Sequence, residues 1–91
     1  MWTTKDIFID IEDAYMKGFI ALEPSYGCEK AKTICDKWRK EITEFIGTAP
    51  FNPYDLARRI DDRSRCYEWD YDFEGELAYL IRLNAKYSLS L

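Results

Sequence analysis

The chain has 91 residues, of which 47% are hydrophobic and 33% are charged, and its net charge is −4. Such a length and balance fit one globular domain rather than a disordered chain, so we expect a single domain over residues 1–91. The chain contains no histidine, the usual general base and transition-metal ligand. We therefore expect no enzymatic activity, no metal site and no cofactor.

The sequence has no apolar run long enough to span a bilayer and no signal-peptide pattern at its N-terminus. We therefore expect a cytoplasmic protein that does not contact membranes. Cys28 and Cys35 lie seven positions apart, which on one helix is about 10.5 Å and too far for an unstrained disulfide. Together with Cys66, they are expected to be free thiols, as is usual in a reducing compartment.

Residues 4–22 carry apolar side chains at steps of three and four, which predicts an amphipathic helix. Its expected buried face contains Phe8, Ile11, Tyr15, Phe19 and Leu22. Its expected polar face contains Asp6, Asp10, Asp13 and Lys17. The alternation of apolar residues over 7–11 leaves a short strand there as an alternative. Proline and glycine within residues 23–27 are expected to end this helix.

Two further helices are expected over residues 28–46 and from Asn52 to about Asp62. In the first, Gly47 is placed to cap the C-terminus. In the second, Asn52 is expected to be the N-cap and Pro53 to take the first helical position. The residues expected to face the core are Ala31, Ile34, Cys35, Trp38, Ile42, Phe45, Ile46, Leu56, Ala57 and Ile60.

A last helix is expected from about Asp72 to Tyr87, with Asp70 or Asp72 as its cap. Leu77, with Leu80 or Ile81, would then face the core. These elements predict an all-α fold, a compact antiparallel four-helix bundle with an extended acidic and aromatic segment before the last helix.

That segment, residues 67–74, alternates aromatic and acidic residues without a break. In an extended backbone the rings would line one face and the carboxylates the other. Residues 66–91 hold five acids and two bases, whereas residues 1–65 hold twelve acids and eleven bases. A concentrated negative charge disfavours direct nucleic-acid binding and suits a basic protein partner. The competing interpretation is an acidic loop whose rings complete the core.

The candidate partner-binding residues are Asp61, Asp62, Tyr67, Glu68, Trp69, Asp70, Tyr71 and Asp72. Residues 70–75 also copy the opening of a calcium-binding loop, but Ile81 stands where the bidentate glutamate belongs. Calcium binding is accordingly not expected.

Residues 60–70, with Asp61, Asp62, Tyr67, Glu68 and Asp70, are followed by an amphipathic helix. This last third of the chain resembles the colicin D-type immunity proteins. The resemblance implies a small acidic helical bundle that blocks a cytotoxic tRNA-cleaving domain by covering its basic active-site cleft.

The leading hypothesis is thus a small inhibitor that neutralises a basic partner, expected to be a nuclease or another nucleic-acid-binding protein, acting as a monomer or dimer. A phage-encoded anti-defence inhibitor, of the anti-CRISPR or anti-restriction type, fits the same features. An oligomerisation or adaptor module without inhibitory role is the alternative from another class.

Overall fold

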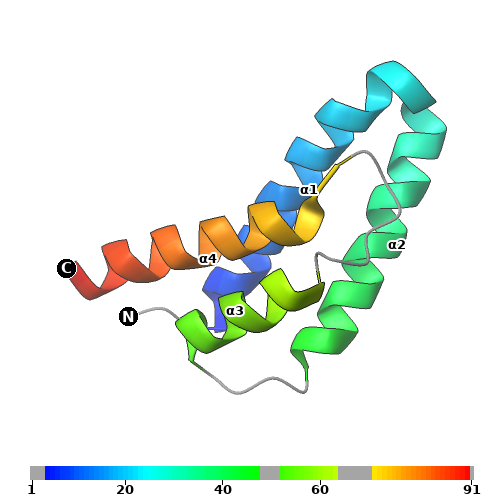
Figure 1. The fold of residues 1–91 in the computed structure, drawn as a ribbon. Coiled ribbons are helices and arrows are strands. Elements are labelled where there is room, and N and C mark those ends of the chain that lie inside the picture. Colours follow the sequence, from blue (N-terminus) through cyan, green and yellow to red (C-terminus); the bar gives the residue numbers. More distant parts are fainter. Residues whose placement is uncertain (1–3, 48–51, 64–70, 91) are drawn as a thin grey trace.

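The computed structural model describes residues 4–47, 52–63 and 71–90, and these residues form four α-helices (Figure 1). They are α1 (Thr4–Tyr26), α2 (Cys28–Ile46), α3 (Pro53–Arg63) and α4 (Phe73–Ser90). The described residues contain no strand, so the predicted all-α class is confirmed and the alternative strand at residues 7–11 is wrong. Within the same residues, no helix is long and apolar enough to cross a membrane.

Helices α1 and α2 form an antiparallel hairpin joined by one residue, Gly27 (Figure 1). Gly27 has φ 83°, a conformation that residues with a Cβ rarely adopt, and its N–H donates to the carbonyl of Glu23 over 2.8 Å. Its own carbonyl accepts from the N–H of Ala31, so the same residue ends α1 and begins α2. The prediction that the helix ends within residues 23–27 is therefore confirmed, with Gly27 as the residue that ends it.

The expected effect of Pro24 was wrong, because α1 continues through it to Tyr26. A proline removes one backbone donor and strains the preceding turn, but here only the last helical turn is affected. The C-terminal end of α2 agrees more closely with the prediction from the sequence. Gly47 follows α2, and its N–H donates to the carbonyl of Thr43 over 3.1 Å, although the glycine has a right-handed conformation.

Cross-helix contacts set the direction of the remaining helices. Asn84 donates to the Asp10 carboxylate near one end of α1, and Glu76 pairs with Lys17 further along it, so α4 runs antiparallel to α1. Helix α3 packs on α4, also antiparallel, with Asp61 bound to Arg82. One hydrophobic core joins all four helices.

The core contains most of the residues expected from the sequence, and on α1 the predicted Ile11 and Leu22 are buried while Tyr15 and Phe19 pack against the core. The buried apolar side chains of α1 are Ile7, Ile11, Ala14 and Leu22, whereas Phe8 is 52% exposed. Asp10, expected in solvent, is fully buried under α4. The prediction was wrong at Phe8 and Asp10 because α1 also carries apolar residues on its solvent side, so spacing alone did not fix the edges of the core face.

Candidate interaction site at the start of α4

The predicted partner-binding residues divide into three groups. Asp61 and Asp62 lie in the last turn of α3, and Tyr71 and Asp72 directly precede α4. The other four candidates, Tyr67, Glu68, Trp69 and Asp70, fall outside the described residues. The described members therefore show what holds the chain before and after residues 64–70.

Tyr71 belongs to the edge of the core. It is half-buried and meets the Phe73 ring edge-on, with ring centroids 4.9 Å apart. Phe73 in turn stacks on Trp38 of α2 at 4.7 Å. Burial, assisted by nearby Glu76, raises the pKa of Tyr71 to about 12. Tyr71 thus keeps its proton at neutral pH and anchors the segment, which agrees in part with the interpretation that the rings complete the core.

Asp72 is the N-cap of α4. Its Oδ1 accepts a hydrogen bond from the Gly75 backbone N–H over 2.9 Å, and its carbonyl accepts from the N–H of Glu76. A Cβ added to Gly75 would come within 2.8 Å of the Asp72 carboxyl carbon, so glycine leaves room for this cap. Of the two caps left open by the sequence, Asp72 is the one that the structure uses. The same type of bond at Asn52 caps α3, as expected.

Asp61 ties α3 to α4 through an ion pair with Arg82, with 2.6 Å between Oδ2 and Nη2. Both side chains are substantially exposed, so the pair contributes little stability. Asp62, one position further, lies at the surface.

Glu74, in the first turn of α4, is buried. The Nε of Arg63 lies 3.9 Å from its Oε1, and the Trp38 indole lies beside it. Loss of hydration raises the pKa of Glu74, although its helix N-terminal position, Arg63 and Trp38 act in the opposite direction. Arg63 also covers the Phe45 ring, 4.7 Å from its centroid.

The charge around this site is more concentrated than the total suggests. Residues 61–76 contain seven acids and two bases, so they carry −5, while the rest of the chain carries +1. Ion pairs within the protein offset Asp61, Glu74 and Glu76. The other acids of this stretch are Asp62 and Asp72, together with Glu68 and Asp70, which lie outside the described residues.

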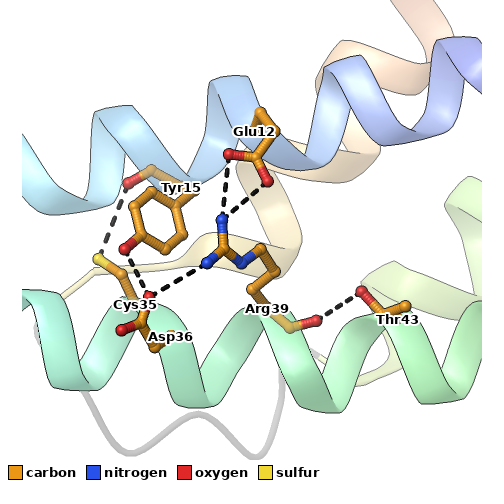
Figure 2. A network of polar contacts seen from close by, with 6 residues as sticks. All are labelled: Glu12, Tyr15, Cys35, Asp36, Arg39 and Thr43. Atoms are coloured by element: carbon orange, nitrogen blue, oxygen red, sulfur yellow. Dashed lines mark hydrogen bonds and ion pairs between the residues drawn. The ribbon is translucent and has the colours of Figure 1, made fainter.

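A second polar group, which sequence reasoning missed, joins α1 to α2 (Figure 2). Tyr15 donates to Asp36 over 2.6 Å, while Arg39 binds Glu12 and Asp36 and lies over the Tyr15 ring. Burial and the bond to Asp36 raise the pKa of Tyr15 to about 12. The sequence showed only that these residues lie on or near the polar faces of two helices, and it did not show which of them would meet.

The same interface buries one of the cysteines. Cys35 is buried against α1, its Sγ lies 3.7 Å from the Tyr15 carbonyl oxygen, and burial raises its pKa to about 11. A thiol with a raised pKa is a poor nucleophile. Cys28 is exposed, and Cys28 and Cys35 are free, as expected, while Cys66 lies outside the described residues. In the described part of the chain, no three acids or cysteines gather as a metal site.

The chain matches no protein-family model, and no curated protein or solved structure shows significant similarity to it.

Proposed function

We propose that the protein is a small acidic inhibitor that binds and neutralises a basic, nucleic-acid-processing protein. The observation that carries this proposal is the net charge of −5 within residues 61–76 of a chain whose remainder is nearly neutral. A charge so localised attracts a basic cleft over a distance of about one Debye length, roughly 8 Å at physiological salt. The acids would occupy the space that phosphates normally fill.

The anchoring of the segment supports this role. Tyr71 and the Asp72 cap fix the chain to α4 after residues 64–70, and Asp61, on α3 before them, is paired with Arg82. A stretch of chain that is fixed on both sides loses less conformational entropy on binding than a free one. The colicin D-type resemblance of the same residues points to the same class of partner.

The test compares two charge reversals of equal size. Glu68→Lys with Asp70→Lys changes the proposed site, whereas Glu41→Lys with Glu44→Lys changes exposed acids on α2. Each variant is used to capture proteins from a cell lysate, and the nuclease activity of each captured protein is then measured with increasing amounts of inhibitor.

We expect the unaltered protein and the α2 variant to capture and inhibit a basic nuclease, and the site variant to do neither. Binding should weaken strongly as salt is raised from about 50 to 500 mM, since charge pairing at an exposed surface is screened. Inhibition by the site variant at unaltered potency, or binding that is insensitive to salt, would overturn the proposal.

An oligomerisation or adaptor role is the second candidate, and one observation favours it. Helix α1 exposes Ile9, Met16 and Ile20 to solvent, on the side opposite its core residues Ile11 and Ala14. This role does not exclude inhibition, because Asp61, Tyr71 and Asp72 lie on other parts of the fold.

A further inference from the structure

Helix α1 carries a stripe of large apolar side chains on its solvent side. Ile9, Met16 and Ile20 are 57%, 53% and 67% exposed. Their spacing of seven and four places them on one line along the helix, opposite the core residues Ile11 and Ala14. We call these three residues the outer stripe. The solvent side of a helix is ordinarily polar, so the stripe has no role in folding the single chain.

Charged residues border the outer stripe. Their order along α1 would place opposite charges together if a second copy of the helix ran antiparallel to it. Lys5 lies beside its N-terminal end and Glu23 beside its C-terminal end. On the other border, Asp13 and Lys17 stand four positions apart. Lys5 is in the first turn of α1 and Glu23 is in the last, so both charges lie at the unfavourable ends of the helix dipole.

We propose that the outer stripe binds the outer stripe of a second copy of this chain, with the two α1 helices antiparallel across a two-fold axis. Ile9 of one copy then meets Ile20 of the other, and Lys5 meets Glu23. Asp13 likewise meets Lys17, which within its own chain also pairs with Glu76. The midpoints of these three pairs are 14.5, 14 and 15 in the order given, so a single register brings the members of each pair to within about one residue of each other.

The alternatives within a dimer are less favourable. A parallel arrangement would bring the two Lys5 side chains to one end of the contact and the two Glu23 side chains to the other, so Lys5 and Glu23 could not pair. The antiparallel arrangement also brings a carboxylate to each N-terminal end and an ammonium group to each C-terminal end, which corrects the unfavourable dipole interactions. A second copy is therefore the occupant whose charges match this surface.

The dimer leaves the start of α4 accessible. Phe73, the first residue of α4, contacts Gly18 on the core side of α1, opposite the outer stripe. Because three side chains per copy make a contact smaller than the standard interface of about 800 Å² per partner, we expect a Kd in the micromolar range or weaker. The inference is independent of the proposed inhibitory function.

Sedimentation equilibrium of the purified chain between about 10 µM and 1 mM tests the association. The average mass should rise from 10.8 kDa towards twice that value. Ile9→Glu with Ile20→Glu should weaken the dimer more than tenfold, since carboxylates would then face each other, while the circular dichroism melting curve stays intact. The matched control is Tyr54→Ser, which removes a comparably exposed apolar side chain from α3.

A charge swap tests the antiparallel register. Lys5→Glu should raise the Kd about tenfold at low salt, because it places two carboxylates together at both ends of the contact. The double variant, Lys5→Glu with Glu23→Lys, should restore the dimer, since the swapped charges still match in a second identical copy. A mass of 10.8 kDa at every concentration, a dimer unaffected by the stripe variant, or failure of the swap to restore it would each overturn the proposal.

Discussion

The ring of Phe73 lies directly on the backbone of Gly18. A Cβ at residue 18 would come within 2.6 Å of the ring Cζ, closer than any real contact. The glycine lets α4 start against α1, and the ring is then held on its other side by Trp38. The position of the start of α4 therefore depends on a residue 55 positions earlier in the chain.

Gly18→Ala should destabilise the fold by about 2 to 3 kcal/mol, although alanine favours helices, because the added methyl displaces the Phe73 ring. Chemical denaturation measures the change. Adding Phe73→Leu should recover part of the loss, since the smaller side chain makes room. An alanine variant as stable as the parent protein would show that the ring moves aside freely.

Asp72→Ala should cost about 1 kcal/mol, because the Gly75 N–H loses its acceptor. Asp72→Asn keeps the acceptor and removes the charge, so its stability should stay close to that of the parent protein. Comparing the two variants separates the role of the Asp72 cap in folding from the role of its charge in binding. If Asn at this position destabilised the fold as much as Ala, the cap bond would not be what Asp72 contributes.

Glu74→Gln should change how stability depends on pH. Because burial raises the folded-state pKa of Glu74, the favourable contribution of its protonated form is complete below the ordinary pKa of 4.5 and is lost as the pH rises through the folded pKa. Glutamine does not ionise, so the variant should gain stability over the parent near pH 7 and match it near pH 4. Thermal melts across this range measure the difference. A variant less stable at pH 7 than at pH 4, relative to the parent, would contradict the sign.

Asn84→Ala should destabilise the fold by about 1 to 3 kcal/mol, because the buried Asp10 carboxylate loses a donor. Asp10→Ala with Asn84→Ala should cost less than the sum of the single changes, since neither polar group then remains buried alone. A double-mutant cycle of unfolding free energies provides the check. Additive losses would indicate that the two side chains do not depend on each other.

Local signals in the sequence predicted the helices well. The start of α3 follows from Asn52 and Pro53, and the bounds of α2 follow from one clean apolar stripe ending at Gly47. These features act between neighbours in the chain, so pattern and cap chemistry suffice to find them.

Long-range features could not be predicted in the same way. Asp10 has the spacing of a solvent residue, and its burial depends on Asn84, 74 positions later. Phe8 was wrongly placed on the core face of α1 because the outer stripe competes with that face in the same periodic pattern. At the candidate site, the sequence found the acids but could not show that Asp72 caps α4 or that Arg82 holds Asp61.

The one-residue junction at Gly27 makes the α1–α2 hairpin intolerant of changes in length. Each residue added to a helix turns the following side chains by about 100°, so an insertion beside Gly27 would carry Asp36 and Arg39 away from Tyr15 and Glu12 together. Substitutions on these helices can be absorbed one at a time, but an insertion there cannot. Homologues of this chain should therefore vary in length at positions other than the α1–α2 junction.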